Sequence, residues 1–129
     1  MGLSIDVEKK QNNTYVVSPK GDIDSETYLK FQQKVKPVLE LSPRVIIIDM
    51  GDVKYISSLG IGVILSTKKS LEKDSRIFMM INLTPSVKKV FDVVSAIPDM
   101  NIFSNQKEAD NYLMKLQQKE IEKGKRTDR

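Results

Sequence analysis

The 129-residue sequence contains no cysteine and no histidine. Without cysteine there can be no disulfide, no thiol nucleophile and no thiolate metal site. Without histidine there is no Ser-His-Asp catalysis, and the usual zinc ligand and the usual general base near neutral pH are missing. We therefore predict a protein that is not an enzyme, with no catalytic residues, no metal site and no cofactor.

Long apolar runs are also absent. No run approaches the roughly 18–20 residues needed to cross a bilayer, and the N-terminal residues lack the basic-then-apolar pattern of a signal peptide. We therefore expect a cytoplasmic protein without a membrane span.

The net charge is +4, but residues 119–129 alone carry five basic and three acidic side chains. No helix-turn-helix, zinc-finger or aromatic stacking motif accompanies this charge. We interpret residues 119–129 as a charged, disordered tail and expect no nucleic-acid partner.

The remaining residues, 1–118, alternate between short apolar runs and amphipathic segments, a pattern typical of an α/β domain. Apolar and β-branched runs predict a hairpin of two strands and then buried strands, over residues 4–10, 14–20, 45–49, 76–81 and 102–103. Helical periodicity predicts about four helices between and after them. We expect one domain whose central sheet has four to five mostly parallel strands.

Helix boundaries can be predicted from capping residues and prolines. Asp24 or Ser25 can accept backbone N–H bonds at the start of the first helix. Pro37 removes a helical hydrogen bond and is expected to kink or stop that helix. Thr84 and Pro85 have the pattern of an N-cap followed by the first helical residue.

The most informative segment is Ser57-Ser58-Leu59-Gly60-Ile61-Gly62, between a buried strand and a helix. A helix start leaves backbone N–H groups unpaired and carries the positive end of the helix dipole, so it tolerates a phosphate. The simplest alternative is that a serine caps the helix and the glycines only allow close packing. Phosphate-loop and nucleophile-elbow motifs do not match. A serine phosphorylated by another protein needs only exposure.

Residues 53–65, Val53-Lys54-Tyr55-Ile56-Ser57-Ser58-Leu59-Gly60-Ile61-Gly62-Val63-Ile64-Leu65, resemble the signature of bacterial anti-sigma-factor antagonists, which is the STAS domain. Gly21-Asp22-Ile23-Asp24 is similar to that family's Gly-acid-Leu-Asp sequence. The strand at 45–49 and the segment from Thr84 to Asp92 also resemble family elements. Together the resemblance covers roughly residues 4–116.

The resemblance implies a single STAS-like domain that switches partners. The partner is an anti-sigma factor with serine kinase activity, which binds the unphosphorylated antagonist; phosphorylation ends the binding, and a serine phosphatase resets the switch. Aligned by the glycines, the phosphoacceptor is Ser58, with Ser57 as a rival. The implied partner-binding residues are Asp22, Asp24, Ser57, Ser58, Leu59, Gly60 and Ile61.

The sequence departs from the family pattern at three places. Ser57 stands where the signature has Asp, and Leu59 stands where it has a second hydroxyl. The glycine that usually follows the signature helix is absent between Leu71 and Ser75.

Two alternatives remain open. The first is a STAS scaffold that is not phosphorylated, or a small-ligand or nucleotide-binding module in another regulatory complex. The second is a histidine-free enzyme, for which Asp22, Asp24 and Asp49 are the candidate carboxylates. We favour turn and helix-cap roles for Asp22 and Asp24.

Overall fold

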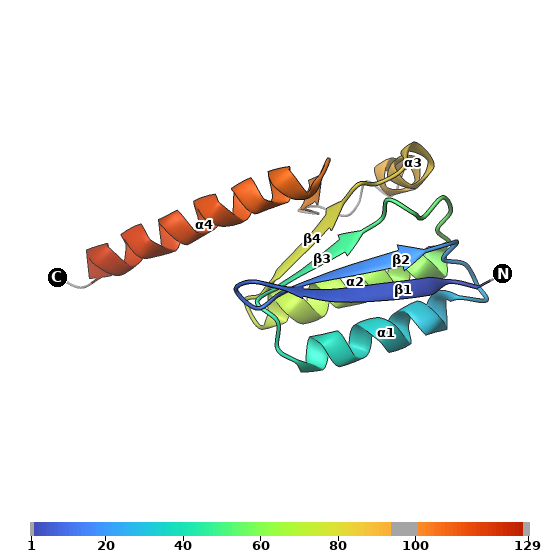
Figure 1. Cartoon of the computed structure of the whole chain (residues 1–129), viewed down its shortest axis with the longest axis horizontal. Helices are drawn as coiled ribbons and strands as arrows, with labels where there is room; N and C mark the ends of the chain where they lie inside the picture. Colours follow the sequence, from blue (N-terminus) through green and yellow to red (C-terminus); the bar gives the residue numbers. More distant parts are fainter. Residues whose placement is uncertain (1, 94–100, 128–129) are drawn as a thin grey trace.

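The computed structural model describes residues 2–93 and 101–127, which form a five-stranded sheet flanked by helices (Figure 1). The strands lie in chain order, β1-β2-β3-β4-β5. β1 and β2 form the predicted antiparallel hairpin, and every other neighbouring pair is parallel. The strands are β1 (Ser4–Lys10), β2 (Thr14–Lys20), β3 (Val45–Asp49), β4 (Ile77–Ile81) and β5 (Ile102–Phe103). The prediction of a mostly parallel sheet that opens with a hairpin is confirmed.

The helices cover both faces of the sheet. They are α1 (Tyr28–Glu40), α2 (Ser58–Lys73), α3 (Pro85–Val93) and α4 (Gln106–Thr127). Figure 1 shows α1 and α2 on one side of the sheet and α4 on the other. None of these helices, within residues 2–93 and 101–127, has the length and apolar character that crossing a membrane requires.

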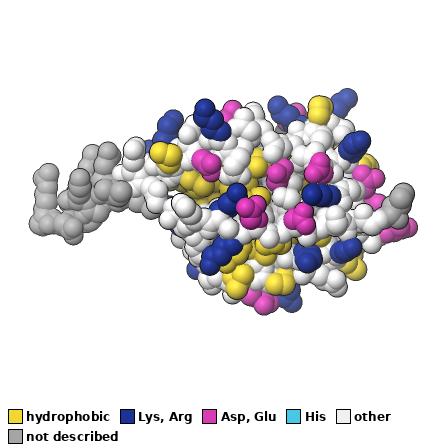
Figure 2. Space-filling model, viewed as in Figure 1, with side chains coloured by type: hydrophobic (Ala, Val, Ile, Leu, Met, Phe, Trp, Pro, Cys, Tyr) yellow, Lys and Arg dark blue, Asp and Glu magenta, His cyan; other side chains and the backbone are white. Residues whose placement is uncertain are grey.

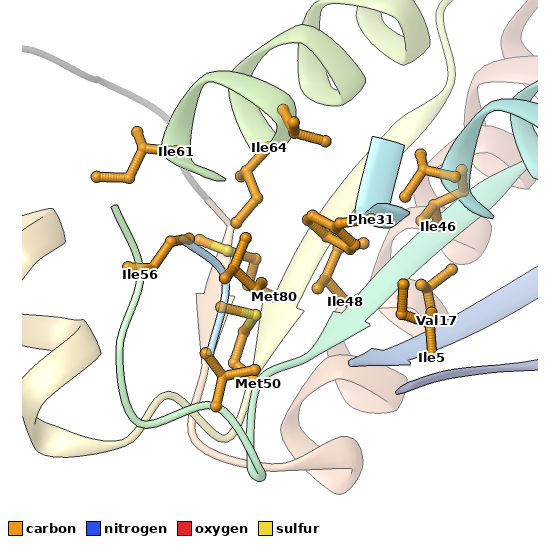
Figure 3. Packing of buried hydrophobic residues seen from close by; sticks show 14 of the residues in the cluster. Ile5, Val17, Phe31, Ile46, Ile48, Met50, Ile56, Ile61, Ile64 and Met80 are labelled. Carbon is orange, nitrogen blue, oxygen red and sulfur yellow. The ribbon is translucent and has the colours of Figure 1, made fainter. Parts of the chain in front are cut away.

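The apolar run in β3 is explained by burial on both faces. Ile46 and Ile48 belong to the core beneath α1 and α2, whereas Val45 and Ile47 belong to the smaller core beneath α4. All four are fully buried, as expected when helices cover both faces of a parallel sheet. Figure 3 shows the larger core, in which Phe31 of α1 lies against β3.

The outer strand β1 presents charges of both signs. On the face that carries β1, acidic and basic side chains are interspersed rather than gathered (Figure 2). Four of them form two exposed ion pairs, Lys20 with Asp6 at 3.1 Å and Lys10 with Glu8 at 3.2 Å. Charges on an edge strand discourage pairing with a further strand. A mixed surface of this kind is not the basic stripe that nucleic acid requires.

The first helix does not stop at the proline. The sequence predicted that the helix kinks or stops at Pro37, and the stop does not occur, because α1 continues through Pro37 to Glu40. Pro37 removes the hydrogen bond to the carbonyl of Gln33, and both residues are exposed. Water can satisfy the freed carbonyl there, and the burial of Val38 beyond the proline favours one further turn.

The last helix is longer than the sequence suggested. The sequence predicted a disordered tail over residues 119–129, whereas α4 continues to Thr127. Residues 115–123 consist mostly of Lys, Glu, Gln and Leu, which have high helix propensity. Charge composition alone therefore did not distinguish a disordered tail from the end of a helix.

At the end of α2, Ser75 occupies the position where the family usually has glycine. Ser75 has a φ of +58°, in the left-handed region that glycine adopts without strain. The amide of Arg76 donates to the carbonyl of Leu71 at 2.8 Å, and that of Ser75 to Glu72 at 3.0 Å. This pair of bonds is the Schellman motif, whose left-handed position is usually glycine.

Replacing Ser75 by Gly is expected to raise the free energy of unfolding by about 0.5–1 kcal/mol, because glycine relieves the left-handed strain at this position. Urea denaturation of both proteins measures the change. The matched control is Ser70→Gly, in the exposed interior of α2, which is expected to lower stability by roughly 0.5 kcal/mol. A loss of stability in both variants would contradict this explanation.

Candidate functional site

Two loops at the carboxyl ends of the strands bring the predicted site residues together. Ile23, in the loop after β2, forms a parallel bridge with Ile56, in the loop before α2. The amide of Ile23 donates to the carbonyl of Tyr55 at 3.0 Å, and the amide of Ser57 donates to the carbonyl of Ile23 at 2.8 Å. Asp22 and Asp24, on either side of Ile23, therefore lie beside the start of α2.

Ser57 caps α2. Its backbone is extended, with φ −88° and ψ 171°, and its hydroxyl oxygen accepts a hydrogen bond from the amide of Gly60 at 3.3 Å. The carbonyl of Ser57 accepts the helical bond from Ile61 at 2.9 Å. Ser57 thus performs the capping role that an Asp would have at this position, and its side chain is only partly exposed.

Ser58 is the first residue of α2, and its side chain is exposed. The first turn of a helix presents N–H groups without helical partners and carries the positive end of the helix dipole. No acidic residue lies in the first turn of α2. The start of α2 itself therefore favours a negative group attached to the hydroxyl of Ser58.

Asp24 holds the loop on the other side of the site. Its carboxylate accepts from the amide of Glu26 at 2.9 Å and from the amide of Thr27 at 3.0 Å. The bond from Glu26 is the main cause that lowers the pKa of Asp24 from its ordinary value of 3.8. Asp24 is thus charged at neutral pH, and it caps the turn before α1, which begins at Tyr28. Asp22 is exposed.

The two glycines of the segment have different roles. A Cβ on Gly60 would lie 2.6 Å from Cγ2 of Ile23 and 2.8 Å from Cγ1 of Ile56. Gly60 therefore allows α2 to approach both loops of the site. Gly62 is exposed, and a Cβ there meets no atom within 4 Å.

Of the residues predicted to bind a partner, two lie inside the protein. The side chain of Ile61 is buried and belongs to the core that contains Ile56 and Ile64 (Figure 3). Gly60 is buried as well. These two residues position the segment, whereas Ser58 and Leu59 are exposed and present its surface.

The sequence did not indicate what fixes the loop before α2. The hydroxyl of Thr84 donates to the carbonyl of Val53, and the hydroxyl of Ser86 donates to the carbonyl of Lys54, both at 2.8 Å. The start of α3 thereby anchors the loop that leads to Ser58. In the sequence Thr84 indicated only a helix start, because a cap residue does not show which other groups it contacts.

The carboxylates considered for an enzyme have structural roles or are exposed. Asp49 accepts from the amide of Gly51 at 3.0 Å and from the side-chain amide of Asn82 at 3.1 Å. Asp24 is used as a cap, as described above. Among the described residues, no group of three or more acidic side chains is arranged to hold a metal ion.

Comparison with known proteins is consistent with this geometry. A family model described as the STAS domain matches residues 4–109. The anti-sigma-B factor antagonist of Bacillus subtilis (strain 168) is 28% identical over 93 residues, which are 72% of this chain and 84% of that protein. The anti-sigma-B factor antagonist of Staphylococcus aureus (strain NCTC 8325) is 23% identical over 93 residues, which are 72% of this chain and 85% of that protein.

Solved structures show the same fold. An anti-sigma factor antagonist from Mycobacterium paratuberculosis has a TM-score of 0.77 at 22% identity, covering 86% of this chain and 93% of that one. The unphosphorylated anti-sigma factor antagonist SpoIIAA has a TM-score of 0.72 at 21% identity, covering 86% and 96%. SpoIIAA has also been solved in a phosphorylated form, with a TM-score of 0.66 at 21% identity, covering 85% and 99%.

Proposed function

The chain belongs to the STAS domain family, and on that premise we propose that it is an anti-sigma factor antagonist that works by partner switching. The unphosphorylated protein binds an anti-sigma factor that is also a serine kinase, and thereby frees a sigma factor. Phosphorylation of Ser58 ends this binding, and a serine phosphatase restores it. The curated relatives named anti-sigma-B factor antagonist support the assignment.

The observation that carries the proposal is the contrast between the two serines. Ser57 uses its hydroxyl to cap α2, whereas Ser58 exposes its side chain at the positive end of the same helix. A kinase can reach Ser58 without unfolding the helix start. Modification of Ser57 would require the cap to break, so Ser58 is the acceptor in our proposal.

The chemical step needs only the serine from this chain. The Ser58 hydroxyl oxygen attacks the γ-phosphorus of ATP held by the kinase, and the bond from that phosphorus to the oxygen bridging the β- and γ-phosphates breaks. ADP leaves, and the serine proton passes to a base of the kinase. Because the phosphate donor is ATP, the switch operates in the cytoplasm.

The phosphate acts on the complex rather than on the fold. A phosphoserine brings nearly two negative charges, which the start of α2 tolerates in the free protein. In the complex the same charges are buried against the partner without a matching cation, which costs several kcal/mol. Shifting the ratio of bound to free protein from 99:1 to 1:99 requires a change of about 5.5 kcal/mol in binding free energy. This single modification supplies much of that change.

The test is a pull-down from an extract of the source cell, with and without added ATP. Without ATP, the wild-type protein is expected to retain its partner. With ATP, the partner is expected to dissociate from the wild type but to remain on Ser58→Ala, because that variant lacks the acceptor. Retention by the wild type that is identical in both conditions would contradict partner switching and support a scaffold that is not phosphorylated.

A further inference from the structure

The outward face of α2 carries the acceptor serine at one end and two lysines towards the other. Ser58, Gly62, Ser66, Lys69 and Lys73 are all exposed. At about 100° per residue, these five positions fall within a sector of about 80° around the helix axis. The buried residues of α2 lie on the opposite side of the helix. The face therefore points away from the core.

The charge on this face is one-sided. No acidic residue lies in the first turn of α2, and Lys73 lies in its last turn. Lys68 pairs with Glu72 at 2.8 Å, outside the sector. Within the described part of the chain, neither Lys69 nor Lys73 forms an ion pair. Both lysines thus remain available to an anionic group that comes from outside the chain.

The middle of the face has small side chains. A Cβ on Gly62 would meet no atom within 4 Å, so no internal contact requires a glycine at this position. Alanine would stabilise the helix, because glycine is among the poorest helix formers. Ser66, one turn later, is also small. Small side chains at a helix contact allow a short distance between the two helix axes.

We propose that this face is the contact of a homodimer that forms when Ser58 is phosphorylated. The proposal rests on the proposed function, because the phosphate is the one that the kinase transfers to Ser58. Two copies of α2 pack antiparallel, with the two-fold axis at Ser66. Each face meets the same face of the second copy, as a two-fold interface requires.

The spacing of residues along α2 makes the face self-complementary. Ser58 lies eight residues before Ser66, and Lys73 lies seven residues after it. These separations are roughly 12 Å and 10.5 Å at 1.5 Å per residue. In the antiparallel pair, Lys73 of the second copy is therefore level with Ser58. Lys69 of the second copy is about one turn away.

Phosphorylation decides whether the two copies attract or repel each other. Without phosphate, Lys73 of each copy approaches the positive end of the other α2, and four lysines share one contact without counter-charge. A phosphoserine brings nearly two negative charges, so two phosphates balance the four lysines. Each phosphate accepts hydrogen bonds from Lys69 and Lys73 of the second copy.

The dimer encloses the phosphate that a phosphatase must reach. Above the dissociation constant of the dimer, removal of the phosphate from Ser58 requires that the two copies first separate. The phosphorylated antagonist is therefore stored as a protected dimer, and its return to the unphosphorylated form slows as the protein concentration rises.

The test uses the full-length protein with phosphoserine incorporated at position 58 during synthesis, so that no kinase is needed. Sedimentation equilibrium compares it with the unphosphorylated wild type. The phosphorylated protein is expected to have a dimer Kd at least about tenfold lower. Sodium chloride at about 1 M is expected to remove most of this difference, because salt screens contacts at the surface.

Paired substitutions test the charges. Lys69→Gln combined with Lys73→Gln is expected to return the phosphorylated protein to the dimer Kd of the unphosphorylated wild type. The matched control, Lys88→Gln combined with Lys89→Gln, removes the same charge from exposed positions of α3. This control is expected to keep the dimer Kd of the phosphorylated protein within twofold.

The absence of cysteine allows a direct test of the two-fold axis. With phosphoserine at position 58, Ser66→Cys is expected to form a disulfide between two copies under mild oxidation, because its two copies lie opposite each other. Ser4→Cys, at the exposed start of β1, is expected to remain monomeric under the same oxidation.

An equal dimer Kd with and without phosphate would overturn the homodimer, and so would an unchanged Kd in the Lys69 and Lys73 double variant. Because the phosphoserine is incorporated directly, either result would leave the proposed function standing. Absence of phosphate from Ser58 in the cell would overturn the proposed function, and the regulated dimer with it.

Discussion

Replacing Ser58 by Asp is expected to weaken binding to the anti-sigma factor at least 100-fold, which is about 3 kcal/mol. The reason is that in the proposed complex a carboxylate at position 58 would be buried against the partner without a matching cation. In the free protein the same carboxylate lies at the positive end of α2, where it is tolerated. The melting temperature is therefore expected to change by only about 2 °C.

Titration calorimetry with the purified partner and a thermal melt measure the two effects separately. The matched control is Ser58→Ala, which removes the hydroxyl without adding charge and is expected to bind within a few-fold of the wild type. Equal affinity of the wild type and Ser58→Asp would contradict the switch. A large fall in melting temperature would instead show that the site does not tolerate the charge in the free protein.

Replacing Gly60 by Ala is expected to have the largest effect on stability, a loss of about 1–3 kcal/mol. The new Cβ would lie 2.6 Å from Ile23 and 2.8 Å from Ile56, both of which are buried and have no room to move aside. The start of α2 must then shift away from the two loops that it joins. Because those loops position Ser58, phosphorylation is expected to slow as well.

Gly62→Ala is the matched control for stability, since it adds the same methyl group two residues later with no atom within 4 Å. It is expected to raise the free energy of unfolding by up to about 1 kcal/mol. Urea denaturation of the two variants gives the comparison directly. If both substitutions changed stability by the same amount and sign, close packing at Gly60 would not be the cause.

The strands and the order of the elements could be predicted because buried strands consist of apolar residues, which are visible in the sequence. A strand covered on both faces must be apolar throughout, as β3 is. Helix starts depend on neighbouring residues, so Pro85 indicated the start of α3 correctly. These signals are local, and the apolar one is clearest at β3 and β4.

The two errors in helix length came from residues whose type alone does not decide the outcome. Pro37 removes a helical hydrogen bond wherever it lies, but the cost is small when the freed carbonyl of Gln33 faces water. At residues 119–127, the charged side chains are compatible with either a tail or a helix.

The position of Ser57 and Ser58 at a helix start was predicted correctly, but the different hydrogen bonding of their hydroxyls was not. Only the structure shows that the hydroxyl of Ser57 accepts a hydrogen bond from the amide of Gly60, whereas the side chain of Ser58 is exposed. The anchoring contacts of Thr84 join parts of the chain 31 residues apart and leave no local signal.

The most direct test of the account is the position of the phosphate on the protein isolated from its own cell. Trypsin is expected to release residues 55–68, a peptide that contains Ser57, Ser58, Ser66 and Thr67. Fragment ions that separate Ser57 from Ser58 then assign the modified residue by mass spectrometry. The account predicts phosphate on Ser58. Phosphate on Ser57 or elsewhere at high occupancy, or no phosphate in any growth condition, would contradict it.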